Sequence, residues 1–224
     1  MEAVARSLAA VVALAAAFFV IAEPAMATEE PKYELLEASP DGAIEVRRYA
    51  PTLRAEVTVD GDRDQAASAG FRILAAFIFG DNETQDDIAM TAPVTQTPAD
   101  AKTSEKIAMT APVTQTPVGE RQWTIGFVMP SKYTVETLPK PTDPRISIVE
   151  TPGYDAAAVR FSGRYTASNF EKHQGELDTF MADRGLLAAG SPTYLFYNGP
   201  FTPFFMRRNE IMVRIERVPA EAAG

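Results

Sequence analysis

Apolar and polar residues alternate along much of this chain, and the alternation predicts short β-strands. The clearest case is residues 53–59, where the sequence Leu-Arg-Ala-Glu-Val-Thr-Val places apolar side chains on one face and polar side chains on the other. Similar runs bounded by turn residues predict further strands at residues 33–36, 44–49, 123–129, 133–138, 146–150, 156–161, 193–197 and 210–218.

Two segments have the spacing of amphipathic helices instead. Residues 64–79 end before Gly80, which suits the position after a helix. Their apolar face consists of Ala66, Gly70, Ile73, Leu74, Phe77 and Ile78. Residues 167–184 begin after Thr166, a good N-cap, and end before Gly185. Their apolar face consists of Phe170, Leu177, Phe180 and Met181.

The order of these elements predicts an α+β fold. Strands precede and follow each helix, so the chain divides into two similar βαββ-like halves. We expect the halves to form one curved sheet or barrel with both helices packed on it. No linker interrupts residues 28–218, which predicts a single domain, and residues 219–224 are expected to form a flexible tail.

The first 27 residues have the layout of a secretory signal peptide. An uncharged apolar run at residues 8–22 precedes the sequence Glu-Pro-Ala-Met-Ala, which predicts cleavage after Ala27. The run is shorter than the roughly 20 apolar residues of a membrane span. We therefore expect a periplasmic or secreted protein, and a retained N-terminal membrane anchor is the alternative.

Composition excludes several classes of function. A net charge of −9 without any Lys/Arg run longer than two residues argues against nucleic-acid binding. The chain has no Cys and one His, which excludes disulfides, Cys–His catalysis and multi-His metal centres. It also lacks Gly-x-Ser-x-Gly and phosphate-loop motifs. A pair of carboxylates remains open, but we expect a protein that is not an enzyme.

An eleven-residue segment occurs twice. Residues 88–98 and 107–117 both read Ile-Ala-Met-Thr-Ala-Pro-Val-Thr-Gln-Thr-Pro. Neither copy contains a Cys, a His or an acid, so the simplest interpretation is a duplicated strand. We hypothesise that the two copies form an extended hairpin arm, with one copy in the sheet and the other beside it.

Seven segments together resemble the SOUL family of haem-binding proteins. The most specific is residues 106–113, Lys-Ile-Ala-Met-Thr-Ala-Pro-Val. The other segments, in chain order, are residues 33–36, 44–51, 77–82, 127–131, 159–163 and 203–211. The resemblance implies a distorted antiparallel β-barrel flanked by two helices, and binding of haem or another tetrapyrrole. The fold is also similar to small-molecule effector-binding domains of the gyrase-inhibitor type, and neither likeness implies an enzyme.

The resemblance leaves the iron ligand open. One proposal for animal members uses a His near the start of the domain, where this chain has none. The chain's single histidine, His173, lies at the edge of the second helix's apolar face and is either an axial ligand or a half-buried His with a polar neighbour. Met90 and Met109 are the other conceivable iron ligands, and both also suit core positions.

A porphyrin also needs an apolar cleft with cations at its rim. The first helix offers Ile73, Phe77 and Ile78 for the cleft, and the cations that could meet propionates are Arg72, Lys172, Arg207 and Arg208. Each of these cations could equally be a solvated surface charge. The aromatic, Pro-stiffened residues 199–206 could form a cleft wall, a partner surface or an ordinary packed loop.

Three functions follow from these patterns. The first is an exported carrier or scavenger of haem, the second a binding module for another apolar small molecule, and the third an interaction protein without a cofactor.

Overall fold

The computed structural model describes residues 28–84, 104–199 and 201–217. The chain forms, in order, β1 (Tyr33–Ala38), β2 (Ile44–Tyr49), β3 (Thr52–Asp60), α1 (Arg63–Phe79), β4 (Asn82–Glu83), β5 (Val113–Gly119), β6 (Gln122–Val128), β7 (Lys140–Pro141), β8 (Ser147–Thr151), β9 (Tyr154–Phe161), α2 (Ala167–Asp183), β10 (Leu186–Ala188), β11 (Thr193–Phe196), the 3-10 helix η1 (Phe204–Met206) and β12 (Asn209–Arg217).

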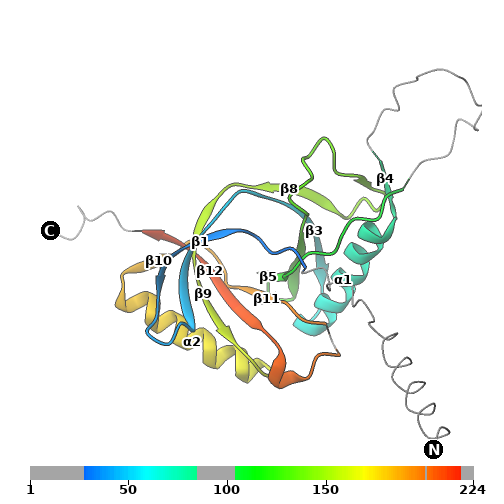
Figure 1. Cartoon of the computed structure of the whole chain (residues 1–224). Helices are drawn as coiled ribbons and strands as arrows, with labels where there is room; N and C mark the ends of the chain where they lie inside the picture. Colours follow the sequence, from blue (N-terminus) through cyan, green and yellow to red (C-terminus); the bar gives the residue numbers. More distant parts are fainter. Residues whose placement is uncertain (1–27, 85–103, 200, 218–224) are drawn as a thin grey trace, which may run out of the picture.

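The main sheet has the order β1-β2-β9-β12-β11-β5-β6-β3-β8, and β10 pairs with β12 off this path. All of these pairs are antiparallel. The sheet curls into a half-barrel, with α1 and α2 outside it on different sides (Figure 1). This arrangement confirms the predicted α+β fold.

The two predicted halves meet at the centre of the sheet. The first unit, β3-α1-β5-β6, and the second, β9-α2-β11-β12, join where β5 pairs with β11. Each unit is then extended by a strand from the other half of the chain, because β2 pairs with β9 and β8 pairs with β3. The exchange ties the two units together.

Helix α1 forms where its sequence pattern predicts. The side chain of Asp62 caps its N-terminus by accepting a 2.9 Å hydrogen bond from the backbone N–H of Gln65. At its C-terminus Gly80 has φ 130°, a conformation that favours glycine. Its buried face, which packs on β3 and β6, consists of Ala66, Gly70, Leu74, Phe77 and Ile78.

Helix α2 also agrees with its prediction. Thr166 accepts a 3.3 Å hydrogen bond from the backbone N–H of Asn169, and Gly185 follows the helix with φ 64°. The buried residues are the four that the spacing predicts. The core under α2 is separate from the core under α1.

A third cluster lies on the face of the sheet opposite α2. Ala156, Ala158 and Met212 belong to it, and they alternate along β9 and β12 with residues that face α2. Tyr49 and Leu195 complete the buried set, which lines the inside of the half-barrel.

One predicted strand is wrong. Residues 133–138 form turns, in which the Thr134 backbone N–H donates to Thr137 Oγ1 at 2.9 Å and the Leu138 N–H donates to the Thr134 carbonyl at 2.9 Å. These local bonds compete with a strand ladder. The short strands β4, β7 and β10 carry too few residues to show a periodic pattern.

The second copy of the duplicated segment enters the sheet. Ile107 is buried in the core under α1, and the copy continues into β5. The first copy, with Met90, lies outside the described residues, so the hairpin arm stays a hypothesis. Among the described residues, no helix combines the length and apolar character that a membrane span requires.

Candidate functional site

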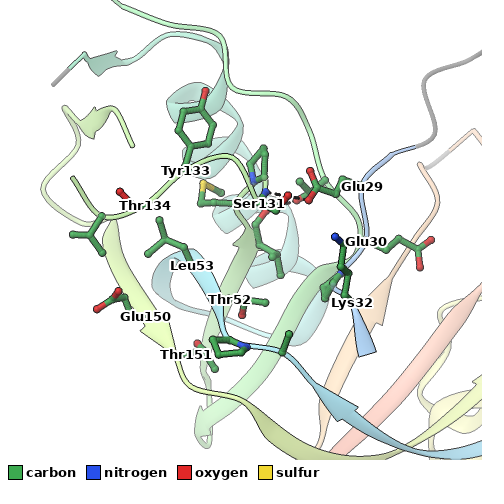
Figure 2. Close-up of a pocket in the computed structure, with 18 of the residues that line it drawn as sticks. Glu29, Glu30, Lys32, Thr52, Leu53, Ser131, Tyr133, Thr134, Glu150 and Thr151 are labelled. Carbon is green, nitrogen blue, oxygen red and sulfur yellow. Dashed lines mark hydrogen bonds between the residues drawn. The ribbon is translucent and has the colours of Figure 1, made fainter. Parts of the chain in front are cut away.

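A cavity of about 520 Å³ opens beside the end of the half-barrel. Four stretches of chain surround it: residues 29–32, 50–53, 128–135 and 150–152, together with Thr110. Figure 2 shows Glu29, Glu30 and Lys32 on one side of this space and Thr134 and Glu150 on the opposite side. The volume lies within the roughly 300–1,000 Å³ range of small-molecule sites.

The N-terminal segment, residues 29–32, is fixed to the domain as a strap. The carbonyl of Glu29 accepts a 2.9 Å hydrogen bond from the Ala111 N–H, and its carboxylate accepts one of 3.0 Å from the Ser131 N–H. The side chain of Glu30 accepts two 3.0 Å bonds from Nη1 of Arg208. These contacts hold the strap across the open end of the half-barrel.

The strap separates the cavity from a smaller space inside the half-barrel. The inner space measures about 30 Å³, enough for one water molecule, and four tyrosines line it. Both spaces are bordered by Glu30, Pro31, Thr52 and Val128. The wall between the two spaces therefore includes strap residues and residues of β3 and β6.

The duplicated motif lies at this boundary. Thr110 borders the large cavity and Pro112 borders the inner space. The Thr110 hydroxyl donates a hydrogen bond to the carbonyl of Val128, which anchors the motif to the end of β6. The peptide bond between Ala111 and Pro112 is cis.

Two side chains on the 128–135 stretch carry groups that can coordinate iron. Met129 is almost completely buried, and its N–H donates to the Leu53 carbonyl at 2.7 Å. Tyr133 donates its hydroxyl proton to Glu105 at 2.7 Å. Burial raises the pKa of Tyr133, and the bond to Glu105 adds to this effect against the opposing influence of Lys132. The phenol therefore stays protonated at neutral pH, whereas Met129 belongs to the core under α1 and its thioether would have to turn towards the cavity to meet an iron.

A charged network lies on the inner side of the strap. Glu210 is completely buried and accepts hydrogen bonds from Arg47 (2.6 and 3.3 Å), Arg160 (3.2 Å), Arg208 (3.0 Å) and the Tyr197 hydroxyl (3.0 Å). Burial alone would raise the pKa of Glu210, but the bonds and charges of Arg47 and Arg208, with the Tyr197 bond, hold it below its usual value. The carboxylate is therefore ionised.

The tyrosines of the inner space already contact arginines. Arg47 lies 4.6 Å from the ring centre of Tyr33, and Arg208 lies 3.6 Å from that of Tyr197. Arg214 lies 4.2 Å from the ring centre of Tyr154. Three of the four tyrosine rings of this space thus have one of the protein's own arginines over them.

The residues predicted on the first helix point in two directions. Phe77 and Ile78 are buried in the core under α1, and Ile73 is half-buried against it. Arg72 is exposed. None of the four borders the large cavity. A haem on this helix would have to displace its packing against the sheet.

His173 is on the other helix, with a different environment. Its ring stacks on Phe161 at a centroid distance of 4.2 Å, and Nδ1 lies 2.7 Å from Glu176 Oε2. This is the half-buried histidine with a polar neighbour that the sequence left open. His173 does not border the large cavity, and its role as an iron ligand remains a prediction.

The remaining predicted residues are dispersed. Met109 is exposed, and it immediately precedes Thr110 at the cavity. Arg207 donates to the Thr202 carbonyl at 2.8 Å and lies over the ring of Tyr165. Arg208 binds Glu30 of the strap, which gives it a direct link to the lining of the cavity. Lys172 pairs with Glu176 on α2.

Sequence reasoning missed the strap and the 128–135 stretch as site components. The resemblance did include residues 127–131, which end at the cavity. No local pattern marks residues 29–32, because their role depends on partners far along the chain.

The family model for SOUL heme-binding proteins matches residues 28–214, which include every segment of the site. The chain belongs to the SOUL family. A human relative, Heme-binding protein 2, is 40% identical over 74 residues, which cover 32% of this chain and 36% of the relative. The match thus spans about a third of that protein's length.

Two solved structures have a similar fold to this SOUL-family chain. The C-terminal domain of EcmrR superposes with a TM-score of 0.53 at 13% identity, covering 83% of this chain and 99% of that domain. A hydrolase from Listeria innocua gives a TM-score of 0.51 at 16% identity, covering 77% of this chain and 91% of that protein. At these identities the likeness concerns the fold alone.

Proposed function

We propose that this protein binds haem or a related tetrapyrrole in the large cavity and acts as an exported carrier or scavenger rather than as an enzyme. The observation that carries the proposal is the position of the family's most specific motif, which borders a cavity of about 520 Å³ through Thr110. Membership of a haem-binding family supports the choice of ligand.

The lining suits a flat ligand that is mostly apolar. Leu53, Val128, Met129 and Pro130 offer apolar contact, and Lys32 is the cation placed to meet a propionate. The iron of a bound haem would accept a thioether ligand, and Met129 could supply it if its side chain, which packs in the core under α1, turned towards the cavity. Glu29 and Glu30 are already engaged by Ser131 and Arg208, so they do not oppose the propionates as free charges.

The signal-peptide layout of the first 27 residues supports export, with a retained N-terminal anchor as the alternative.

A binding module for another apolar small molecule is the second function, and the four tyrosines of the inner space raise the case of an apolar organic cation. The tyrosines inside the half-barrel have the right chemistry for it. However, Arg47, Arg208 and Arg214 already cover three of their rings, and a cationic ligand would have to displace them. We therefore favour an uncharged or anionic planar ligand in the large cavity.

Titration of the purified protein with hemin tests the proposal. We expect a Soret shift that saturates near one equivalent. Met129→Leu should change the position of the Soret band, because the axial group changes while the apolar contact remains. His173→Ala should leave the spectrum as in the wild type, because His173 lies away from the cavity.

Two results would contradict this account. Absence of a saturable Soret change would exclude haem as the ligand, and thermal stabilisation by other apolar compounds would then support the second function. Loss of the Soret shift in His173→Ala with retention in Met129→Leu would move the site to α2.

A further inference from the structure

Four apolar side chains, the three of η1 and that of Phe201 before it, are exposed to solvent. Phe201 is 99% exposed, Met206 66%, Phe205 65% and Phe204 45%. Single exposed apolar residues are common on protein surfaces, but a contiguous group is typical of a surface that binds another protein, a ligand or a membrane. We call these four residues the aromatic loop. No residue of η1 is buried.

The aromatic loop is held firmly in this exposed position. Its backbone accepts a 3.0 Å hydrogen bond from the Gly163 N–H at the Phe204 carbonyl, and one of 2.8 Å from Arg207 Nε at the Thr202 carbonyl. The Met206 N–H closes a turn onto Pro203 at 2.9 Å. The apolar side chains are therefore presented by a built turn, and Figure 1 shows the connection between β11 and β12, in orange, running along the outside of the molecule.

The surroundings of the aromatic loop are basic, although the protein carries a net charge of −9. Residues 184–209 contain no Asp or Glu, and neither do residues 156–170, which pack beside them. Arg164 lies 4.8 Å from the ring centre of Phe204, and Lys172 borders the same surface hollow as Phe204. Arg207 follows the loop directly. The acids paired nearby are Glu30, with Arg208, and Glu176, with Lys172.

Protruding aromatic side chains with a basic border are the pattern of a surface that enters the interface of an anionic bilayer. Each Lys or Arg near such a surface contributes about 1 kcal/mol of attraction, which salt screens. Phe201 is almost fully exposed, so its ring is available to enter such an interface.

The start of the described chain lies on the same side. The ion pair between Glu30 and Arg208 brings the N-terminal strap next to the segment that follows the aromatic loop. The apolar run at residues 8–22 ends six residues before Thr28, so about 20 Å of chain at most separates it from the domain. A membrane reached by that run, before or without cleavage, would be within reach of the aromatic loop.

We propose that the aromatic loop is a membrane-docking surface for anionic phospholipid, with Phe201, Phe205 and Met206 entering the boundary between headgroups and acyl chains and Arg164, Lys172 and Arg207 meeting lipid phosphates. None of the four residues of the aromatic loop lines the proposed haem cavity, so either proposal can fail without the other.

The test uses the full chain with a fluorescent reporter in the loop. The wild type has one tryptophan, Trp123, which lies on β6, so Phe205→Trp adds a second signal at the aromatic loop. With vesicles of phosphatidylcholine and phosphatidylglycerol, we expect the added emission to shift to the blue and to be quenched by brominated lipid. Because the N-terminal run could bring the full chain to vesicles by itself, this local signal, rather than sedimentation alone, reports insertion of the loop.

Serine variants measure how much the loop contributes. The double change Phe201→Ser and Phe205→Ser should lower the partition coefficient by about tenfold or more, because two exposed rings no longer enter the bilayer. Phe79→Ser is the matched control, because Phe79 is 57% exposed at the C-terminal end of α1. This variant should leave partitioning unchanged. Raising the salt concentration, or using phosphatidylcholine alone, should weaken binding of the wild type.

Three results would overturn the proposal. One is unchanged, unquenched emission of Phe205→Trp at vesicle concentrations where the chain sediments. Another is equal partitioning of the double-serine variant and the wild type. The last is a change in oligomeric state, with the wild type a dimer and the double-serine variant a monomer in light scattering, which would assign the loop to contact with a second copy.

Discussion

Glu210 is the residue on which the inside of the half-barrel depends. It lies on β12. Its hydrogen-bond donors are Arg47 on β2, Arg160 on β9, Tyr197 just after β11 and Arg208 just before β12. A buried ion pair contributes less than its geometry suggests, but removing one partner leaves the others charged and unsatisfied. The network therefore matters most when it is broken.

Replacing Glu210 by Gln should destabilise the fold by about 3–5 kcal/mol at neutral pH, because buried arginine charge loses its counter-ion. The folded-state pKa of Glu210 is depressed, so its contribution is complete above its ordinary value of 4.5 and is lost as pH falls through the folded pKa. Urea unfolding between pH 3 and 7 should thus show a shallower acid loss in Glu210→Gln than in the wild type.

Glu216→Gln is the control, because Glu216 is exposed on the same strand. It should change neither the stability at neutral pH nor the slope at low pH. A Glu210→Gln protein as stable as this control would show that the network does not hold the sheet together.

Sequence alone could not find this network. Arg47 lies in β2, a strand that the alternation predicts correctly. It is buried, but the residues around it in β2 do not alternate strictly between buried and exposed, so the pattern does not assign Arg47 to the core. Its partner Glu210 is 163 residues away. Periodicity reports which face a residue occupies, whereas the partner depends on how distant strands pair.

At the scale of the element, Gly70 marks a close approach of α1 to the sheet. A Cβ at this position would overlap the side chain of Ile125 on β6. Gly175, in α2, has no atom within 4 Å of the position that a Cβ would take. The same residue type therefore has opposite roles in the two helices.

Gly70→Ala should destabilise the protein by about 1–3 kcal/mol, because α1 must move away from β6 or Ile125 must change rotamer. Gly175→Ala should stabilise it by about 0.5–1 kcal/mol through the better helix propensity of alanine. Thermal or urea unfolding of both variants measures the difference. A stabilising Gly70→Ala would show that the helix does not approach the sheet as closely as described.

The elements could largely be predicted because their signals are local. Both helices have capping residues and a buried face that the spacing defines. The error at residues 133–138 has the same origin: a run of alternating residues next to Pro130 satisfies its backbone in turns instead of a ladder. The residues predicted on α1 do not border the cavity, because the apolar face of this helix packs against the sheet, as Phe77 and Ile78 show.

At the scale of the whole molecule, the repeat of βαββ units explains where the cavity forms. The cavity is lined by segments from both halves of the chain: the strap, the turn before β3, the stretch after β6 and the turn after β8. These segments meet because β2 and β8 are exchanged between the units. Sequence predicted the units, but the exchange, and hence the cavity, follows from long-range pairing. Such pairing has no local signature.

The strap also links the two proposed surfaces. Glu30 borders the cavity and binds Arg208, which lies just beyond the aromatic loop. A movement of the aromatic loop could therefore be transmitted to the cavity through the ion pair between Arg208 and Glu30.

The most direct measurement of the central claim is hemin binding by a variant whose cavity is filled. Thr52 borders the cavity at the start of β3, whereas Thr58 is exposed further along the same strand. We expect Thr52→Trp to weaken hemin binding by about tenfold or more, a loss of about 1.4 kcal/mol or more, and Thr58→Trp to bind as the wild type does. Equal hemin affinity in Thr52→Trp, Thr58→Trp and the wild type, with all three folded, would contradict the assignment of haem to this cavity.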